Sequence, residues 1–180
     1  MHDISIGEVT WLKLIDKKRG PQFLDLIKTN RNYLREWLGW VDDFQTISDI
    51  EKYLDSSLRD LSIRKVLRFW IIKQDQLVGI VHLTDINWTK REAIIGYWVG
   101  EQYRGQGLAE KATRAMINFA FDEWKLNRIE IMCATENAAS QSIPVKLGFK
   151  REGILENNEW LYDHHVDHQV FSMLSEDWVR

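Results

Sequence analysis

The chain has little of several features that would mark a special class of protein. Cys133 is its only cysteine among 180 residues, so no disulfide framework can form within one chain. Only two prolines occur, Pro21 and Pro144, and no segment is rich enough in proline or serine to act as a linker. No apolar run approaches the ~20 residues that cross a bilayer, and the first residues lack the apolar core of a signal peptide. We therefore expect one domain over residues 1–180, located in the cytoplasm and without a membrane partner.

The chain also lacks a large excess of charge of one sign. The formal net charge is −3 at pH 7, and the absence of a basic excess argues against nucleic acid as the main ligand. Hydrophobic residues make up 44% of the chain, which is typical of a globular protein. Tryptophan is abundant instead, with nine residues, and Trp37 and Trp40 stand just before Asp42 and Asp43. Such rings either pack in the core or line a cleft for a cationic or peptide ligand.

The spacing of apolar residues predicts an α+β fold with a mixed sheet, in the order β-α-α-β-β-β-α-β-α-β-β. Strands are expected at residues 9–14, 67–72, 77–83, 92–99, 128–134, 149–160 and 165–174. Helices are expected at residues 20–38, 46–61, 107–124 and 138–147, with both prolines at or near helix starts.

One segment between a predicted strand and a predicted helix indicates a phosphate-binding loop. It reads Gln102-Tyr103-Arg104-Gly105-Gln106-Gly107-Leu108-Ala109. Glycine tolerates a positive φ and lets the backbone approach a ligand, and the first N–H groups of a helix have no helical partner. A dinucleotide fingerprint would need a third glycine where Glu110 stands, and no Walker triplet occurs. Taken alone, the motif fits an ordinary glycine turn equally well.

This segment resembles the acetyl-CoA pyrophosphate loop of the GNAT N-acetyltransferases. Four further segments resemble the ribosomal-protein (Rim-type) N-terminal acetyltransferase branch of that family. They are residues 33–40, residues 95–99, residues 137–140 with 146–149, and Glu152-Gly153 with the C-terminal hairpin. The predicted element order is also similar to the GNAT fold over nearly the whole chain. The resemblance implies acetyl-CoA as cosubstrate and no metal.

The resemblance also implies which residues hold acetyl-CoA. Its pantetheine arm would add to the splayed fourth strand of the family's sheet through the backbone of Trp98, Val99 and Gly100. Its pyrophosphate would bind the N–H groups of Arg104, Gly105, Gln106, Gly107, Leu108 and Ala109. The Arg104 side chain would either add positive charge there or remain solvated. Asn137 is expected to cap the following helix and also to contact the pantetheine.

Acetyl transfer requires a neutral amine, a donor for the oxyanion and a proton for the leaving thiolate. The thiolate-protonating tyrosine usual in the family aligns with Pro144 and is absent. By resemblance to the ribosomal branch, Ser140 would give this proton and Glu159 would act as the base. Ile94 replaces a glutamate of that branch, and Glu92, two residues earlier on the same strand face, is a second candidate base. The ordinary alternatives are a local hydrogen bond for Ser140 and solvated surface carboxylates for the glutamates.

The sequence therefore predicts an enzyme that moves acetyl from acetyl-CoA to a primary amine by direct attack in a ternary complex. The preferred acceptor is the N-terminal α-amine of a ribosomal-type protein or peptide. The alternatives are a small amine (polyamine, aminoglycoside or amino acid) and a non-catalytic acyl-CoA-binding module. His164, His165 and His168 do not form a zinc motif, and Cys133 is expected to be an inert core thiol. The C-terminal hairpin and the aromatic surplus are compatible with a homodimer.

Overall fold

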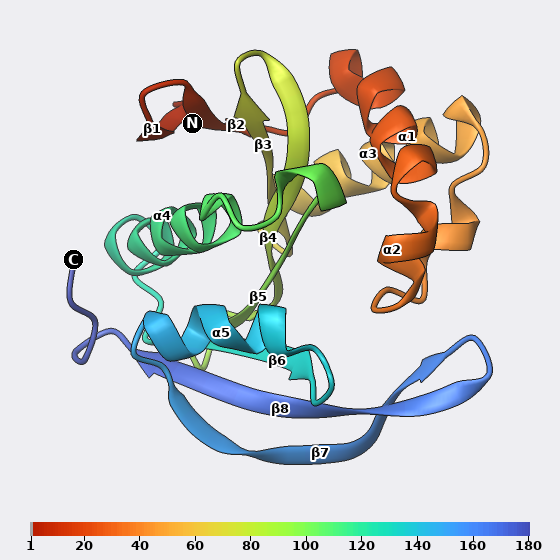
Figure 1. The fold of residues 1–180 in the computed structure, drawn as a ribbon. Coiled ribbons are helices and arrows are strands. Elements are labelled where there is room, and N and C mark those ends of the chain that lie inside the picture. Colours follow the sequence, from red (N-terminus) through yellow and green to blue (C-terminus); the bar gives the residue numbers. More distant parts are fainter. Residues whose placement is uncertain (1) are drawn as a thin grey trace.

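In the computed structural model, which describes residues 2–180, eight strands form one mixed sheet (Figure 1). Their order across the sheet is β1-β2-β3-β4-β5-β6-β8-β7. The strands are β1 (Ile4–Gly7), β2 (Thr10–Leu14), β3 (Leu67–Lys73), β4 (Gln76–Asn87), β5 (Glu92–Val99), β6 (Arg128–Ala134), β7 (Lys150–Leu161) and β8 (His164–Leu174). The helices are α1 (Gly20–Thr29), α2 (Arg31–Arg35), α3 (Ile47–Ser62), α4 (Leu108–Asp122) and α5 (Ala138–Lys146). The predicted α+β class with a mixed sheet is confirmed.

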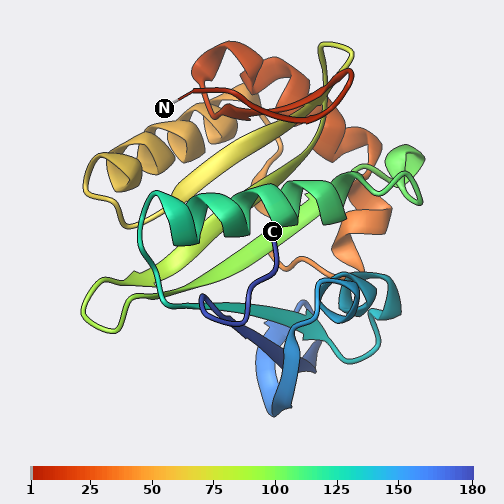
Figure 2. The same ribbon diagram turned by 90° about the vertical axis from the view of Figure 1, so that its left-hand side faces the viewer.

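Helices cover both faces of the central strands. α4 lies across one face, and α1 and α3 pack on the other (Figures 1 and 2). Strand β3 shows the consequence for the sequence: Phe69 and Ile71 belong to the core under α4, whereas Trp70 and Ile72 belong to the core under α1 and α3. Successive side chains of a strand point to opposite faces, so a strand covered on both sides is a continuous apolar run.

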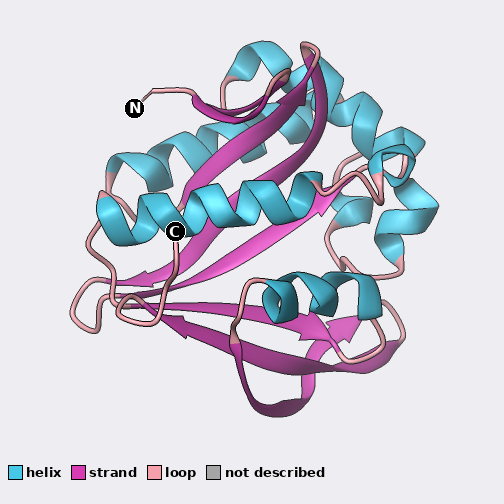
Figure 3. Ribbon diagram, turned by 60° about the vertical axis from the view of Figure 1, so that its left-hand side comes forward, coloured by secondary structure: helices cyan, strands magenta, loops and turns pink. Residues whose placement is uncertain are grey.

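The sheet opens between β5 and β6, its only parallel pair among the described residues. These strands pair over three positions, from Glu92 opposite Arg128 to Ile94 opposite Glu130. Beyond them the two strands diverge: β5 stays paired with β4 as far as Val99, and β6 stays paired with β8 as far as Ala134. In Figure 3 α5 lies over this C-terminal part of the sheet, beside the end of α4 at which the glycine loop enters. The resulting opening separates the two groups of strands on which the candidate site is built.

Four features differ from the prediction by more than two residues or were not predicted at all. The short edge strand β1, paired with β2, was not predicted, because its four residues carry too few apolar side chains to show a pattern. The helix predicted at residues 20–38 ends at Thr29 and is followed by the separate helix α2. Strand β4 runs on to Asn87. Pro144 lies inside α5 instead of near its start, whereas Pro21 stands in the first turn of α1. None of the helices within residues 2–180 has the length and apolar character needed to cross a membrane.

Candidate active site

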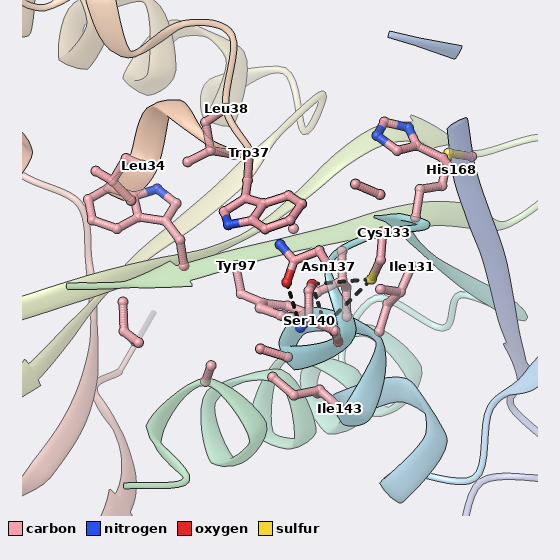
Figure 4. A pocket seen from close by; sticks show the side chains of 18 of the residues that line it. Leu34, Trp37, Leu38, Tyr97, Ile131, Cys133, Asn137, Ser140, Ile143 and His168 are labelled. Atoms are coloured by element: carbon pink, nitrogen blue, oxygen red, sulfur yellow. Dashed lines mark hydrogen bonds between the residues drawn. The ribbon is translucent and has the colours of Figure 1, made fainter. Parts of the chain in front are cut away.

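A cavity of about 350 Å³ occupies the opening between β5 and β6. The side nearer α5 is lined by Tyr97, Gly105, Cys133, Asn137, Ser140 and Ile143. The side nearer α2 is lined by Trp37, Leu38, Trp40, His82, Glu159 and His168. Figure 4 labels members of both groups, with Trp37 and Leu38 across the space from Asn137 and Ser140. The cavity therefore brings the predicted catalytic residues Ser140 and Glu159 into one space, each on its own side.

The glycine loop has the backbone conformation of an anion-binding turn. Gly105 and Gly107 have φ values of 72° and 69°, and Gly107 is the residue before the first turn of α4. The first helical bond of α4 runs from the Lys111 N–H group to the Gly107 carbonyl at 3.0 Å. The N–H groups of the residues between them are therefore directed out of the helix end without a helical partner. This end of α4 also carries the positive end of the helix dipole, so the loop is suited to phosphate.

The side chains of this loop offer a phosphate ligand fewer contacts than its backbone N–H groups do. Gln106 faces away from the cavity, because its Oε1 accepts a hydrogen bond from Lys73 Nζ. Leu108 is buried in the core under α4. Arg104 lies at the rim of the cavity, with its guanidinium carbon 5.2 Å from the centre of the Tyr33 ring. Among these three side chains, only that of Arg104 presents charge to a ligand in the cavity.

The pairing of β5 with its neighbours decides which of its backbone groups face the opening. The Arg91 carbonyl accepts from Arg128 N–H on the β6 side, and the Gly100 N–H group donates to the Val78 carbonyl on the β4 side. Backbone groups alternate between the two edges of a strand, so Tyr97 and Val99 direct theirs into the opening. Trp98 contributes its side chain to the cavity, but its backbone faces β4. Gly100 lies outside the cavity, and both of its backbone groups are already bonded, to Val78 and Tyr103.

At the start of α5, Asn137 and Ser140 form the polar part of the cavity wall. The Asn137 Oδ1 atom accepts from the Ser140 N–H group at 3.0 Å, which confirms the predicted helix cap. The Ser140 hydroxyl lies 3.2 Å from Cys133 Sγ and 3.4 Å from the Tyr97 hydroxyl (Figure 4). Burial raises the pKa of both the Cys133 thiol and the Tyr97 phenol above their ordinary values. Ser140 is therefore surrounded by neutral, protonated groups at physiological pH.

On the other side, a bulge in β7 turns Glu159 toward His168. Leu155 pairs with His168 and Glu159 pairs with Val166, so three residues of β7 lie opposite Asp167 alone. One Glu159 carboxylate oxygen lies 3.4 Å from His168 Nε2. The Asn158 amide nitrogen lies 2.8 Å from His168 Nδ1. The Asn158 amide nitrogen can donate to Nδ1, which leaves Nε2, the ring atom near Glu159, to carry the ring proton.

The second candidate base, Glu92, does not line the cavity. It begins β5, its carboxylate lies 3.4 Å from Lys90 Nζ, and the cavity meets β5 only from Ile95 onward. Glu92 does share a strand face with Gly96, but four residues of strand separate them by roughly 13 Å.

His82 on β4 is a cavity residue that the sequence did not indicate. It pairs with Gly96 across the sheet, and a Cβ atom at Gly96 would lie 2.2 Å from His82 Nε2. Glycine at this position therefore leaves room for the imidazole. Burial, with a smaller contribution from the positive charge of Arg68, lowers the pKa of His82 to about 4. The ring is neutral at physiological pH.

The α2 side of the cavity is mainly aromatic. Trp37 and Trp40 line it, in agreement with the cleft alternative, and the Trp40 ring lies 6.0 Å from that of Trp98. Asp42 does not take part, because it pairs with Arg31 and Arg35. Within residues 2–180, Glu159 is the one carboxylate in the cavity wall.

The family model for the acetyltransferase (GNAT) domain matches residues 19–150. The chain belongs to the GNAT acetyltransferase family. This result confirms the resemblance drawn from the glycine loop and from the order of the elements, and with it the predicted enzyme class.

Relatives of this GNAT protein extend over nearly its full length. The ribosomal-protein-serine acetyltransferase of Escherichia coli (strain K12) is 27% identical over 171 residues, covering 95% of this chain and 96% of its own. The spermidine N(1)-acetyltransferase of Vibrio cholerae serotype O1 is 22% identical over 161 residues, covering 88% of this chain and 90% of its own.

Solved structures share the fold. The ribosomal L7/L12 α-N-protein acetyltransferase RimL, in complex with coenzyme A, has a TM-score of 0.92 at 21% identity and covers 96% of this chain and 98% of its own. The microcin C7 self-immunity acetyltransferase MccE, in complex with acetyl-CoA and AMP, has a TM-score of 0.89 at 24% identity, with 94% of each chain covered. At these identities the likeness establishes the fold alone.

The three histidines of the C-terminal hairpin each contact a different residue. His164 pairs with Asp163 at 2.7 Å, His165 packs its ring against Trp160, and His168 faces Glu159. In the part of the chain that the structure describes, no three His, Cys, Asp or Glu side chains are grouped so as to hold a metal ion.

Proposed function

We propose that this GNAT acetyltransferase moves the acetyl group of acetyl-CoA directly onto the N-terminal α-amine of a peptide or protein. One observation carries the proposal: a single cavity presents Ser140 on its α5 side and Glu159 on its α2 side. Direct transfer requires both substrates in one space, with the leaving thiolate facing a proton donor and the amine facing a base.

The α5 side of the cavity fits acetyl-CoA. The N–H groups from Gly105 to Ala109, at the end of α4, would hold the pyrophosphate, and Arg104 at the rim adds positive charge. The backbone of Tyr97 and Val99 offers an unpaired strand edge to the amide groups of the pantetheine arm. Asn137, next to this edge, keeps its amide nitrogen free of any protein acceptor within residues 2–180. Bound in this way, the thioester would lie near Ser140.

The α2 side fits an amine. A reference α-amine has a pKa near ~8, so it is mostly protonated at pH 7 and must lose a proton before it attacks. We assign this proton to Glu159, directly or through water, with His168 Nε2 beside the carboxylate at 3.4 Å. The amine then attacks the thioester carbonyl, and its nitrogen gives up its second proton to water. The C–S bond breaks as the Ser140 hydroxyl passes its proton to the departing thiolate and takes a proton back from water.

The aromatic wall and its single carboxylate favour an α-amine over a polyamine. A polyamine carries several positive charges, and burying a charge without a partner is costly. An N-terminal residue brings one charge for Glu159 and a peptide chain for the surface formed by Trp37 and Trp40. The 27% identity to a ribosomal-protein-serine acetyltransferase supports the same acceptor class. A spermidine acetyltransferase is also among the relatives, so spermidine is the small amine to test as the alternative acceptor.

Release of free thiol from acetyl-CoA measures this function across a panel of acceptors. The panel contains peptides with free N-termini, the same peptides blocked at the N-terminus but carrying lysine, and spermidine, an aminoglycoside and free amino acids. We expect the highest kcat/KM with free N-termini. A preference for spermidine would replace the acceptor proposal, and no turnover with any amine would leave an acyl-CoA-binding module.

The role of Ser140 is tested in the same assay. Ser140→Ala should lower kcat by roughly 10²–10⁴-fold with little change in the KM for acetyl-CoA, because a general acid acts mainly in the transition state. Ser142→Ala is the matched control, since the Ser142 hydroxyl is exposed and bonds only the Ala139 carbonyl. Equal turnover in both variants would remove Ser140 from the mechanism.

A further inference from the structure

Helix α5 contains a proline whose position leaves one backbone carbonyl without a helical donor. In an α-helix the N–H group of residue 144 would bond the carbonyl of residue 140. Pro144 has no N–H group, and its ring pushes that carbonyl away from the helix axis. The carbonyl concerned belongs to Ser140, the proposed proton donor.

Tyr97, on strand β5, supplies the missing hydrogen-bond donor. Its hydroxyl donates to the Ser140 carbonyl at 2.9 Å and so joins β5 to α5. The ring lines the cavity, and burial raises the pKa of its phenol, so the hydroxyl remains a donor over the physiological range. A phenol on a rigid strand thus replaces the missing helical N–H group.

The same tyrosine lies close to the Ser140 side chain. The Ser140 hydroxyl is 3.4 Å from the Tyr97 hydroxyl, while Asn137 accepts from the Ser140 N–H group at 3.0 Å. Ser140 is therefore held at its N–H group by Asn137 and at its carbonyl by Tyr97. With both backbone groups fixed, the remaining freedom of the residue is the rotation of its hydroxyl.

We propose that Tyr97 is a positioning residue for Ser140, and that Pro144 makes this possible by freeing the Ser140 carbonyl. This inference rests on the proposed function, because it needs Ser140 as the proton donor. Tyr97 itself transfers no proton in this scheme. It sets the distance between the Ser140 hydroxyl on α5 and a thioester bound along β5.

Two double-mutant cycles test the proposal in the full-length protein. Tyr97→Phe should lower kcat roughly five- to fiftyfold, because a small displacement of a catalytic group is costly. Combined with Ser140→Ala, it should lower kcat no further, since residues that act as one unit are not additive. Combined with Pro144→Ala, it should recover a large part of the lost kcat, because the new N–H group can bond the Ser140 carbonyl instead.

Control variants separate this effect from a general loss of structure. Tyr53→Phe removes the hydroxyl of another partly buried tyrosine, which lies on α3 and does not line the cavity. Pro21→Ala removes the proline at the start of α1, where no N–H group is needed. Both should leave kcat within about twofold. An equal fold loss for Tyr97→Phe in the Ser140→Ala and wild-type backgrounds would overturn the proposal, as would the absence of recovery by Pro144→Ala.

Denaturant unfolding of the Tyr97 and Pro144 variants gives a second readout that needs no chemistry. Tyr97→Phe should lower the free energy of unfolding, and should lower it less when residue 144 is alanine. If no acceptor is turned over but this coupling is present, the proposed function fails while the contact stands. Equal losses in both backgrounds would show that Tyr97 does not hold the Ser140 carbonyl, whatever the activity.

Discussion

Gly107 combines a backbone requirement with open space around it. Its φ of 69° is left-handed, and a Cβ atom there would meet no heavy atom within 4 Å. A substitution therefore acts through backbone conformation and not through a clash. We expect Gly107→Val to lower the affinity for acetyl-CoA at least ~10-fold and the free energy of unfolding by ~1–3 kcal/mol. Calorimetric titration and denaturant unfolding measure the two quantities.

The chain offers a matched control for this substitution. Gly153 in β7 also has open space where its Cβ would lie, but its φ is not in the left-handed region. Gly153→Val should change neither acetyl-CoA affinity nor stability beyond ~0.5 kcal/mol. If Gly107→Val bound acetyl-CoA as tightly as this control, the glycine loop would not be the pyrophosphate site.

The assignment of Glu159 as the base predicts how the reaction rate depends on pH. If Glu159 removes the proton of the attacking amine, Glu159→Gln should lose most activity below the amine pKa of ~8, where the amine is protonated. Above that pH the neutral amine is abundant, and the rates of mutant and wild type should converge. The measurement is the pH–rate profile of both proteins with one N-terminal peptide. Parallel profiles would mean that this carboxylate is not the base.

These residues also show how far sequence reasoning reaches. Gly105, Gly107 and the Asn137 cap are local features, so a few neighbouring residues were enough to predict them. His168 was not predicted as a partner of Glu159, because a bulge in the hairpin brings them together and changes the register. Glu92 lies outside the cavity although it is on the expected strand face, because alternation does not say how far along the strand a cavity lies.

At the scale of elements, one buried asparagine connects the end of α1 to the residue just before the glycine loop. Asn30 ends α1, its amide nitrogen donates to the Leu26 carbonyl at 2.8 Å, and its Oδ1 accepts from the Glu101 N–H group at 2.7 Å. An asparagine side chain that bonds nearby backbone competes with the helix, and the predicted long helix breaks here for that reason. Apolar spacing alone could not reveal this, since α2 continues the same pattern.

This contact predicts a measurable loss of stability. Asn30→Ala leaves the Glu101 N–H group without its partner, so the free energy of unfolding should fall by ~1–3 kcal/mol. The exposed neighbour Thr29 is the control, because Thr29→Ala should stay within ~0.5 kcal/mol. Denaturant unfolding compares the two variants. Similar small losses in both would show that the connection to Glu101 does not stabilise the protein.

A charged group joins the three strands at the other end of the sheet. Glu152 on β7 lies 2.6 Å from the Arg128 guanidinium on β6 and accepts from the Ser172 hydroxyl on β8 at 2.7 Å. The hydrogen bond from Arg128, followed by that from Ser172, lowers the pKa of Glu152 from 4.5 to about 2. A carboxyl group with a lowered pKa stabilises the fold above its unfolded pKa of 4.5, and this contribution is lost as the pH falls from 4.5 toward about 2.

Glu152→Gln should therefore lower the stability at pH 7 and flatten its decline below pH ~5. Unfolding free energies of mutant and wild type, measured from pH 7 down to acid, test this directly. Glu156→Gln on the same strand is the control, because Glu156 is exposed. An unchanged acid profile in Glu152→Gln would mean that the group titrates alike in the folded and unfolded chains.

Most elements could be predicted because their patterns are regular. The run Leu67–Lys73 and the amphipathic helices α3 and α4 carry the expected periods, and the glycine loop stands between β5 and α4 as predicted. The opening between β5 and β6 could be predicted only through the family resemblance. It depends on where two strands distant in sequence stop pairing, and no local pattern records that position.

At the scale of the whole molecule, this opening divides the fold into two groups of strands. β1–β5 with α1–α4 carry the glycine loop, while β6–β8 with α5 carry Asn137, Ser140, Glu159 and His168. Direct ladder pairing between the groups is limited to three positions of β5 and β6. Acetyl-CoA bound along β5 would contact both groups, so binding should tighten the molecule as a whole. At 100 times its dissociation constant, it should raise the free energy of unfolding by ~2.7 kcal/mol.

Residue-resolved hydrogen exchange should reveal which backbone groups the ligand contacts. In the free protein the N–H groups of Tyr97 and Val99 face the opening, whereas those of Gly96 and Trp98 face β4 and are already paired. Acetyl-CoA should therefore slow exchange at Tyr97 and Val99 much more than at Gly96 and Trp98. Gly107→Val, titrated with the same ligand concentration, should show little of this change. Slowed exchange at Trp98 and Gly100 instead would mean that acetyl-CoA contacts these backbone groups, as the sequence predicted. Unchanged exchange along all of β5 would mean that the pantetheine arm binds elsewhere.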